Sequence, residues 1–495
     1  MTGLYFNRVS GLLRYERRLI DLLNSQTRAL TRPYESLFRY AFGLAKLGSI
    51  RLEGGRDLRL DEEVQPFRRW FTERLSVAFA EGRAPRVEEL VRLVPLLTLR
   101  VDALRLGLLV RFAGVLSESR LEQELSVKKV ALALGGGGGS GFPHLGVFDM
   151  LEDLGVRPSL IVGTSLGAMM GFMRASVERF DTTSALLDLP QWFDLGGAVR
   201  PFSGGSRFGF PGVFDLDLRE IGRRLCQRDW GNEIPCFSDL PIPLGCVATG
   251  VLRGAGLDEA ALDLAMKRSR GRFAFTPLRT RRLLKVVIEQ MRRLTSNPRF
   301  LTEVVFGLSR QSRPMRVVDG IGFSCSVPGV LHYEVEEEHA DTIAALEALF
   351  AEEGIFRLTD GGLVNNVPSR VAWDAVQSGM LGTRNVLIYG VDVFAPVANR
   401  NALFLPMQQI ARANVIANRP YADLTRTLRK VPSPMNLAPS LKQLQRVVQE
   451  TRVHLAEDRL YLRRALQPQR PYMAWRSEVH LPTSVFSEGD EGRWR

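Results

Sequence analysis

The chain has 495 residues, a length that usually corresponds to two or three structural units. Hydrophobic residues make up 45% and charged residues 24% of the sequence, which is ordinary globular composition and excludes a disordered chain. The four cysteines lie far apart, with no CxxC pair and no histidine at metal spacing. We therefore expect reduced, mostly buried thiols, and neither a metal nor a cofactor.

We expect neither a secretory signal nor a membrane-spanning helix in this sequence. The N-terminus has no uninterrupted apolar run followed by a small-residue cleavage site. The most apolar stretch, residues 94–115, carries Arg100, Asp102, Arg105 and Arg111, too many charges for a spanning helix. It is typical of a buried or amphipathic helix, so we expect a cytoplasmic protein that is soluble or peripherally attached to a membrane.

The net charge of +12 is unevenly distributed. Residues 267–316 contain fourteen Lys and Arg against two acidic residues, and residues 411–470 contain twelve against four. The first stretch also carries Phe273, Phe275, Phe300 and Phe306. Cations mixed with aromatic residues are typical of an element that touches an anionic lipid surface. The alternatives are a solvated helical face or packing against acidic parts of the N-terminal domain. No nucleic-acid-binding motif accompanies the charge, and we expect no nucleic-acid partner.

Apolar spacing divides the chain into three parts. Residues 1–127 show helical spacing, for example in 12–23, 34–47 and 67–79, and predict a helical N-terminal domain. Residues 128–395 alternate short apolar runs with helical segments, as in an α/β domain with a mostly parallel sheet, interrupted by the basic insertion 267–316. Residues 396–495 are expected to form a helical, basic C-terminal extension.

The α/β part begins with a strand, loop and helix that then repeat. An apolar run at 130–134 leads into the glycine-rich loop 135–141, and a helical segment follows at 144–154. A second apolar run at 159–162 leads into Gly-Thr-Ser-Leu-Gly, residues 163–167, and another helix. This order predicts two adjacent parallel strands joined by a right-handed crossover. Further strands are predicted at 242–249, 317–325, 355–359 and 385–393.

Ser165 lies between two glycines, after a buried strand and at the start of a helix. This arrangement is typical of a nucleophile elbow, which projects the serine hydroxyl from the carboxyl edge of a sheet. The positive end of the following helix stabilises negative charge on the oxygen. GxSxG alone is common by chance and often marks a structural turn, so the strand–helix context carries the interpretation.

The glycine run 135–141 suits a loop whose backbone amides converge on one point, as in an oxyanion hole or a phosphate cradle. No Lys-Ser/Thr pair follows, which excludes a P-loop, and no acidic residue ends the next strand, which disfavours a dinucleotide site. The alternative is that the glycine run is a flexible linker with no role in binding. Since adjacent parallel strands end at the same edge, Gly138 and Ser165 are expected to lie at one site.

A third motif, Thr-Asp-Gly-Gly-Leu-Val-Asn-Asn-Val-Pro, covers residues 359–368. An Asp-Gly-Gly on its own is usually a turn. Together the motifs resemble the patatin-like phospholipase family: residues 131–171 are similar to its glycine-rich loop, crossover helix and nucleophile elbow. Residues 360–368 resemble its Asp-Gly-Gly segment, and residues 325–333 resemble the Ser-x-Pro-Gly segment before it. The resemblance covers about residues 128–395.

The resemblance implies a three-layer α/β/α sandwich and a Ser–Asp dyad, with Ser165 attacking the acyl carbonyl and Asp360 accepting its proton. It implies oxyanion donors in the glycine loop at Gly136, Gly137, Gly138 and Gly139. It also implies supporting roles for five further glycines, Gly141, Gly163, Gly167, Gly361 and Gly362. The family usually has Arg or Lys where this chain has Ser140, which puts substrate positioning and rate in question.

Three functions follow as hypotheses. The first is a lipid acyl hydrolase, a phospholipase or lysophospholipase, acting on phospholipid or other lipid esters. The second is an acyl transferase that uses the same acyl-enzyme with another acceptor. The third, motivated by Ser140, is a catalytically weakened fold that serves as a membrane scaffold or regulator. A dyad needs no histidine, and neither His454 nor His480 follows a predicted strand; His144 near the glycine loop is expected at a surface or a helix N-terminus, and His332 is ambiguous.

Overall fold

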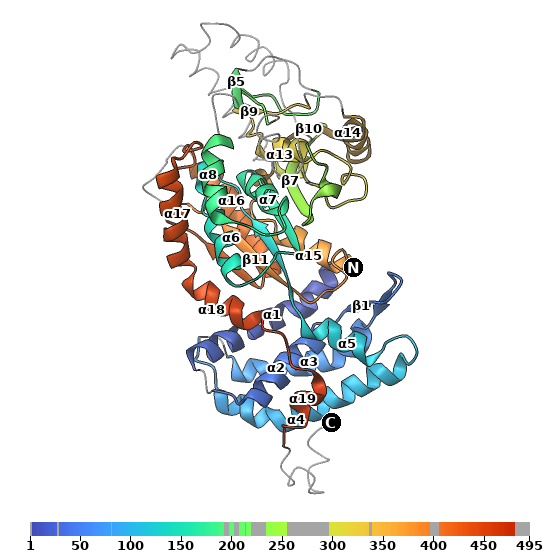
Figure 1. The fold of residues 1–495 in the computed structure, drawn as a ribbon. Coiled ribbons are helices and arrows are strands. Elements are labelled where there is room, and N and C mark those ends of the chain that lie inside the picture. The colour runs from blue at the N-terminus through green and yellow to red at the C-terminus, as the bar shows by residue number, and fades with distance from the viewer. Residues whose placement is uncertain are drawn as a thin grey trace. The chain divides into compact units, whose positions relative to one another are not determined.

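A computed structural model describes most of the chain. The described residues are 2–26, 29–80, 82–192, 198–201, 207–212, 214–218, 234–254, 297–335, 339–396 and 405–480. The chain divides into two compact units (Figure 1): unit 1 comprises residues 1–129, 374–387 and 457–495, and unit 2 comprises residues 130–373 and 388–456. The division near residue 129 agrees with the change of pattern in the sequence. The residues expected as a separate C-terminal extension are shared between the two units.

Unit 1 is built mainly of helices, as the sequence predicts. A short antiparallel hairpin, β1 (Ser49–Arg51) and β2 (Asp57–Arg59), is an addition that the sequence pattern did not indicate. The N-terminal helices are α1 (Thr2–Ser25), α2 (Arg32–Ala45), α3 (Asp61–Ala78), α4 (Val87–Arg111) and α5 (Glu118–Ser126). The C-terminal helices α18 (Ala456–Ala465) and α19 (Tyr472–Arg476) follow much later in the chain.

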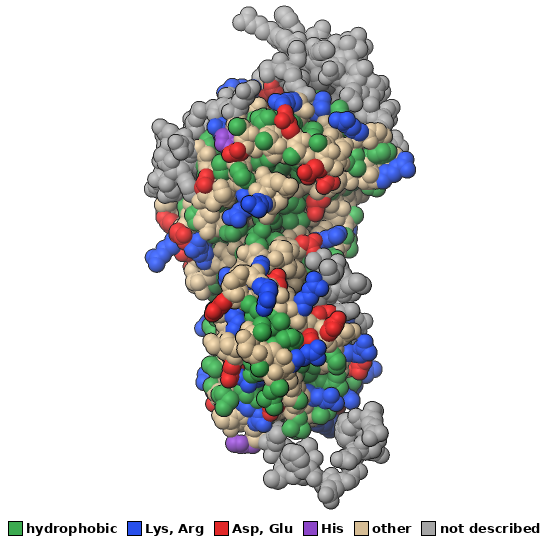
Figure 2. Space-filling model, turned by 90° about the vertical axis from the view of Figure 1, so that its right-hand side faces the viewer, with side chains coloured by type: hydrophobic (Ala, Val, Ile, Leu, Met, Phe, Trp, Pro, Cys, Tyr) green, Lys and Arg blue, Asp and Glu red, His purple; other side chains and the backbone are tan. Residues whose placement is uncertain are grey.

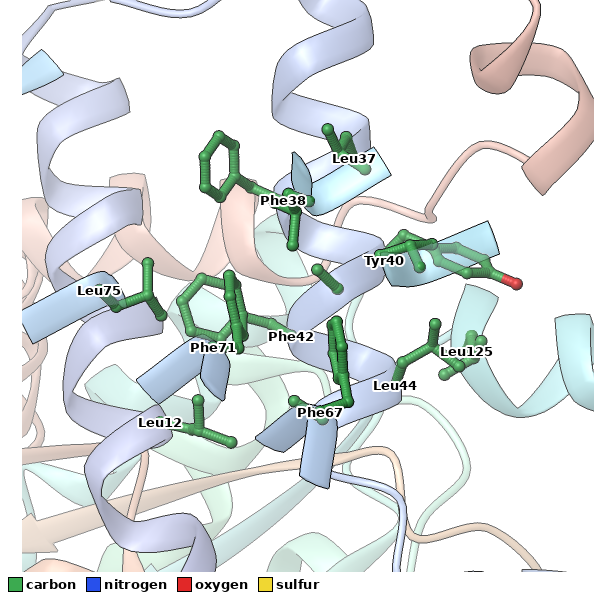
Figure 3. Close-up of a cluster of buried hydrophobic side chains, with 14 of the residues drawn as sticks. Leu12, Leu37, Phe38, Tyr40, Phe42, Leu44, Phe67, Phe71, Leu75 and Leu125 are labelled. Carbon is green, nitrogen blue, oxygen red and sulfur yellow. The ribbon is translucent and has the colours of Figure 1, made fainter. Parts of the chain in front are cut away.

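The core of unit 1 explains why these helices belong together. Leu12, Phe38, Phe42 and Phe71 from the first three helices form one buried cluster (Figure 3). The rings of Phe42 and Phe71 lie 5.1 Å apart in an edge-on arrangement that aromatic pairs favour. Trp475 of α19 belongs to the same cluster. The last described helix is therefore part of the N-terminal core.

Unit 2 contains a seven-stranded sheet with flanking helices, which confirms the predicted α/β sandwich with a mostly parallel sheet (Figure 1). The strand order is β10-β7-β4-β3-β11-β12, with β8 also paired to β7. Strands β3, β4 and β7 are mutually parallel, as are β11 and β12, whereas β8 and β10 run antiparallel to β7. The strands are β3 (Lys129–Leu134), β4 (Leu160–Thr164), β7 (Leu244–Leu252), β8 (Leu301–Phe306), β10 (Ile355–Asp360), β11 (Val386–Asp392) and β12 (Leu424–Thr427).

Helices pack against this sheet and against one another. The helix that follows Ser165, α7, packs on β4 and β7, α13 packs on β7 and β10, and α17 packs on α6. A smaller sheet joins β5 (Val199–Pro201), β6 (Phe214–Leu216) and β9 (Leu331–His332). The helices are α6 (His144–Asp153), α7 (Leu166–Ala175), α8 (Thr182–Trp192), α13 (Val317–Cys325), α14 (Ala340–Glu353), α15 (Ser369–Gln377), α16 (Leu405–Asn418) and α17 (Leu441–His454).

Two sequence-based assignments are wrong. The predicted strand 317–325 is helix α13, buried along its whole length. An apolar run that is buried on all sides has no periodicity to distinguish a helix from a strand. The basic insertion was expected to extend to residue 316, but residues 301–306 form β8, and Phe306 packs in the core rather than at an interface. Residues 267–296, with Phe273 and Phe275, lie outside the described residues.

In the described part of the chain, no helix combines the length and apolarity that a membrane span requires. On the face drawn in Figure 2, basic and acidic side chains are intermixed among apolar ones.

Candidate active site

Ser165 lies in a tight turn between a strand and a helix, the local geometry expected of a nucleophile elbow. Strand β4 ends at Thr164, helix α7 begins at Leu166, and Ser165 between them has φ 54° and ψ −130°. Ser165 is the one non-glycine residue with positive φ in the described chain. Such a conformation costs of order 1–3 kcal/mol and persists only where the surroundings enforce it. It turns the backbone sharply and presents the serine side chain at the strand end.

The two glycines of the elbow allow the strand and the helix to approach closely. A β-carbon on Gly163 would lie 2.5 Å from the carbonyl oxygen of Gly167. A β-carbon on Gly167 would lie 2.4 Å from the carbonyl oxygen of Leu134 in the neighbouring strand. Both distances are below any tolerated contact, so each position requires glycine if this turn is to form.

The sheet register brings Asp360 to Ser165. Thr164, at the end of β4, pairs with Val247 of β7, and Asp360, at the end of β10, pairs with the next residue, Ala248. Strand β4 pairs with the first half of β7, and β10 pairs with the second half. Strand β8 pairs with residues from both halves, so it occupies one edge of β7 and leaves the other edge to β4 and β10. Strands β4 and β10 therefore meet end to end along one edge, and their terminal residues become neighbours.

The surroundings of Asp360 make it a stronger base than an exposed aspartate. The residue is only 6% exposed, and one carboxylate oxygen accepts a hydrogen bond of 2.8 Å from the Gly362 amide. Burial raises the pKa of Asp360 to about 6, while hydrogen bonds from the Ser165 hydroxyl and the Gly362 amide partly offset that rise. At neutral pH the group is mostly a carboxylate, in contact with the hydroxyl it would deprotonate.

The glycine-rich loop lies directly against Ser165. A β-carbon on Gly136 would lie 2.7 Å from the β-carbon of Ser165. Gly137 and Gly138 have φ of 152° and 53°, conformations that glycine adopts readily. A β-carbon on Gly141 would lie 2.8 Å from the side chain of Leu166, which explains the need for glycine there.

One of the four expected oxyanion donors is occupied. The amide of Gly139 donates a 2.8 Å hydrogen bond to the carbonyl of Pro434, so it does not point at an acyl oxygen beside Ser165. The assignment of Gly139 as a donor is therefore corrected, because a backbone amide has a single hydrogen to donate. Gly136, Gly137 and Gly138 remain the candidate donors.

Hydrogen bonds from two buried side chains of unit 2 stabilise the glycine-rich loop. Ser140, at the position where the resembled family has a cation, donates from its hydroxyl to the Gly137 carbonyl at 2.7 Å. His144 is the first residue of α6, which is one of its two expected places, but it is fully buried and not at a surface. Its Nε2 lies 2.8 Å from the Gly135 carbonyl. Burial lowers the pKa of His144 to about 4, so the ring is neutral and Nε2 carries the donated proton. His144 therefore acts as a structural donor to the loop.

The segment after Asp360 connects the three motifs. Asn366 is buried, and its amide lies 3.5 Å from the Gly136 carbonyl. The Thr164 hydroxyl donates to the carbonyl of Asn365 at 2.8 Å. A β-carbon on Gly361 would lie 2.2 Å from the Val247 carbonyl, and one on Gly362 would lie 2.9 Å from the Asp360 carboxylate. The glycines of this motif thus let the turn fold under the carboxylate.

Ser324 is a site residue that the sequence analysis missed. Its hydroxyl accepts a 2.8 Å hydrogen bond from the Ser165 amide and donates a 2.5 Å hydrogen bond to the Val247 carbonyl. The carbonyl of Ser326, two residues on, accepts from the Asp360 amide at 2.8 Å. The end of α13 thus holds both Ser165 and Asp360. The neighbouring Ser-x-Pro-Gly segment was the available signal, but residues 317–325 were assigned to a strand.

Other reactive groups near the elbow are less suited to nucleophilic attack. Burial raises the pKa of the Cys325 thiol well above its usual range, the Asp360 carboxylate raises it further, and the Ser165 hydroxyl partly opposes this shift. The thiol therefore stays protonated beside Ser165. His332 is buried and contacts the Phe210 carbonyl, whereas His454 and His480 are exposed. Among the described residues, no cluster of His, Cys, Asp and Glu is arranged to hold a metal ion.

The hydrogen bonds of Ser324 predict a measurable effect on stability. Ser324→Ala removes the acceptor of the Ser165 amide and a donor to Val247, so we expect the free energy of unfolding to fall by roughly 1–3 kcal/mol. Urea denaturation measures this change. Ser76→Ala, at an exposed position of α3, is the matched control, expected to stay within about 0.5 kcal/mol of the parent. Equal effects of the two substitutions would contradict the assignment.

Comparison with known proteins identifies the domain that carries this site. Residues 132–373 match the family described as patatin-like phospholipase. Patatin-like phospholipase domain-containing protein 6 of Mus musculus and of Homo sapiens is 46% identical over 57 residues, which is 12% of this chain and 4% of each relative. Lysophospholipase NTE1 of Coccidioides immitis is 45% identical over 56 residues, 11% of this chain and 4% of the relative.

The aligned segments thus span a small fraction of these much longer relatives. The family match, in contrast, encloses the glycine loop, the elbow and the Asp-Gly-Gly segment. The fold agrees with it, since both have a mostly parallel sheet with flanking helices. Residues 132–373 of this chain are a domain of the patatin-like phospholipase family.

Proposed function

We propose that the protein is a lipid acyl hydrolase that works through a Ser165–Asp360 dyad. The observation that carries this proposal is the contact of the Ser165 hydroxyl with the buried Asp360 carboxylate, beside the glycine-rich loop. Asp360 accepts the hydroxyl proton while Ser165 Oγ attacks the ester carbonyl carbon, and it passes this proton to the leaving alcohol. Water then loses a proton to Asp360 as it attacks the acyl-enzyme, the fatty acid is released, and the proton returns to Ser165 Oγ.

The physical conditions of the site support each part of this step. Burial brings the pKa of Asp360 closer to neutrality, which improves its match to proton transfer without a histidine. The amides of Gly136, Gly137 and Gly138 are candidate donors to the oxyanion. Donors that are fixed before the reaction stabilise the developing charge at little cost in reorganisation. The strained backbone at Ser165 keeps the hydroxyl at the strand end.

The family and the relatives support a substrate class. The family is described as phospholipases, and a relative of the matched segment is named a lysophospholipase. We therefore propose phospholipid or lysophospholipid esters as substrates. An alcohol in place of water would make the same acyl-enzyme a transacylase. Ser140 maintains a hydrogen bond within the loop, which favours a working oxyanion hole over the scaffold alternative.

We also propose that residues 267–296 contact anionic membranes. This stretch holds most of the cations counted between 267 and 316, together with Phe273 and Phe275. Basic residues near an anionic surface each contribute about 1 kcal/mol of attraction, and aromatic side chains favour the interface. The protein would then act peripherally on lipid in the bilayer.

The dyad predicts which substitutions abolish hydrolysis. Ser165→Ala and Asp360→Asn are each expected to lower kcat on a p-nitrophenyl ester by at least a thousandfold, because nucleophile and base act as one unit. His454→Ala and His480→Ala, at exposed positions, are controls expected to retain the parent kcat. Mixed phospholipid vesicles with product analysis by mass spectrometry identify the lipid. Equal inertness of the parent and Ser165→Ala across all lipids would favour the scaffold.

The pKa of Asp360 predicts the acid limb of the pH profile. Its pKa is raised to about 6, so below that pH the carboxyl keeps its proton and cannot accept one from Ser165. We expect kcat/KM to fall as pH decreases through about 6 and to be constant just above pH 7. Unfolding followed at the same pH values separates titration from loss of structure. An acid limb near pH 4 would show that Asp360 is not desolvated as described.

The basic stretch predicts charge-dependent membrane binding. Changing Arg281, Arg282, Arg292 and Arg293 to Glu should weaken sedimentation with anionic vesicles at least tenfold, since four attractive charges become repulsive. A control with the same charge change replaces exposed arginines of unit 1, Arg74, Arg83, Arg86 and Arg92. We expect this control to bind more strongly than the test variant. Equal binding of both variants would argue against a membrane role for residues 267–296.

A further inference from the structure

A short segment beyond the family-matched residues lies on the glycine-rich loop. It comprises residues 433–437, hereafter the C-terminal strap, between β12 and α17. Its Pro434 carbonyl accepts the hydrogen bond of the Gly139 amide at 2.8 Å. A β-carbon on Gly139 would lie 2.2 Å from the Asn436 carbonyl oxygen, and one on Gly138 would lie 2.6 Å from the Pro434 carbonyl oxygen. The backbone of the strap therefore packs directly on the backbone of the loop at Gly138 and Gly139.

Before the strap, the chain is fixed to the edge of the central sheet. Strand β12 pairs with β11, with Thr427 opposite Asp392, and the Leu428 amide donates to the Asp392 carbonyl at 2.8 Å. Phe394, just past β11, packs against the loop, since a β-carbon on Gly137 would lie 2.9 Å from its ring. The strap thus starts from a strand pair that itself borders the loop.

After the strap, the chain is fixed to the helix that follows the loop. Helix α17 begins with a reciprocal capping arrangement of Ser440 and Gln443 and packs on α6. A β-carbon on Gly146 of α6 would lie 2.6 Å from the side chain of Thr451, which shows how closely the two helices approach. Arg452 adds ion pairs of 2.6 and 2.8 Å to Asp149 and Asp153. Both ends of the strap are therefore anchored.

The glycine loop needs such support. Five consecutive glycines have high conformational freedom, and ordering them is costly in entropy. The Ser140 hydroxyl donates to the Gly137 carbonyl, and His144 donates to the Gly135 carbonyl. The contacts on Gly138 and Gly139 come from the strap. Pro434 restricts the strap backbone itself, and Pro432 restricts the residue immediately before it.

We propose that the C-terminal strap positions the oxyanion hole, holding Gly139 so that the amides of Gly136, Gly137 and Gly138 face the acyl oxygen at Ser165. This inference rests on the proposed function. The strap residues are positioning residues, because they act through the loop and not on the substrate. The catalytic apparatus then extends past residue 373, the end of the family match, to a segment supplied by the C-terminal part of the chain.

The test loosens the strap without changing its carbonyl groups. In Pro432→Gly/Pro434→Gly the fixed backbone angles are lost, and kcat on a p-nitrophenyl ester should fall roughly ten- to hundredfold, with KM within about twofold. Binding of a trifluoromethyl ketone, which forms a tetrahedral adduct with the serine, should weaken in proportion. Binding of an unreactive alkyl ether analogue should not change, since it makes no oxyanion.

The matched control is Pro468→Gly/Pro471→Gly, which changes two exposed prolines between α18 and α19 in unit 1. We expect parental kcat for this control. A double-mutant cycle with Gly139→Ala, which displaces the strap from the loop side, should give losses that are not additive, because both changes break one contact. Parental kcat and ketone binding in the strap variant, equal losses in the control, or additive losses in the cycle would each overturn the proposal.

Hydrogen exchange separates this inference from the proposed function. If the parent shows no Ser165-dependent hydrolysis, the proposed function fails. The role of the strap is then tested by the hydrogen-exchange rates of the backbone amides of residues 138 and 139. Faster exchange there in the strap variant, but not in the control, supports positioning of the loop. Unchanged exchange overturns it. If the parent is active and Ser165→Ala is inert, the kinetic comparison alone decides.

Discussion

The site depends on a constraint in the sheet: two strands of opposite direction end at neighbouring positions of a third. Strand β4 delivers Ser165 at the position opposite Val247, and β10 delivers Asp360 opposite Ala248. Side chains on sheet termini are held more precisely than those on free loops, because the ladder fixes the backbone. Two segments far apart in sequence therefore meet without a dedicated linking element. The antiparallel direction of β10 is what allows its last residue to point back toward the elbow.

The residues around Ser165 and Asp360 stabilise two conformations or environments that are unfavourable by themselves. Ser165 has a strained backbone, and Asp360 is an acidic side chain removed from water. Both states are compensated locally. Ser324 and Ser326 at the end of α13 bind the amides of Ser165 and Asp360, and the Gly362 amide binds the carboxylate. A buried acid with two hydrogen-bond donors keeps its charge near neutral pH while gaining basicity. Such a combination of strain and desolvation is typical of catalytic sites.

Much of this arrangement could be predicted from sequence. The strand–glycine–helix order around Ser165 and the glycine run determine local geometry, because few residues other than glycine tolerate the close approaches at Gly163 and Gly167. The adjacency of β3 and β4 followed from the right-handed crossover rule. The proximity of Asp360 was inferred from family resemblance, and the register of β7 supplies its physical reason.

Other features depend on contacts that no local pattern encodes. Residues 317–325 were assigned to a strand because β-branched and apolar residues favour both a strand and a fully buried helix; the packing of α13 on β7 and β10 decides between them. Strand β8 was missed because residues 301–306 lie in a stretch that was assigned as an insertion from its high positive charge. The occupation of the Gly139 amide depends on Pro434, a residue distant in sequence, so only the folded chain reveals which glycine amides remain as donors. Likewise, the complete burial of His144 could not be predicted from its position after the glycine-rich loop.

The most direct measurement of the central claim is the site and rate of covalent trapping by a fluorophosphonate lipid analogue, followed by peptide mass spectrometry. We expect a single adduct on Ser165, formed quickly by the parent protein and at least a hundredfold more slowly when Asp360 is replaced by Asn, in a chain that remains folded. An adduct on another residue, or trapping at Ser165 that is indifferent to Asp360, would contradict the account of a nucleophile and base brought together along β7.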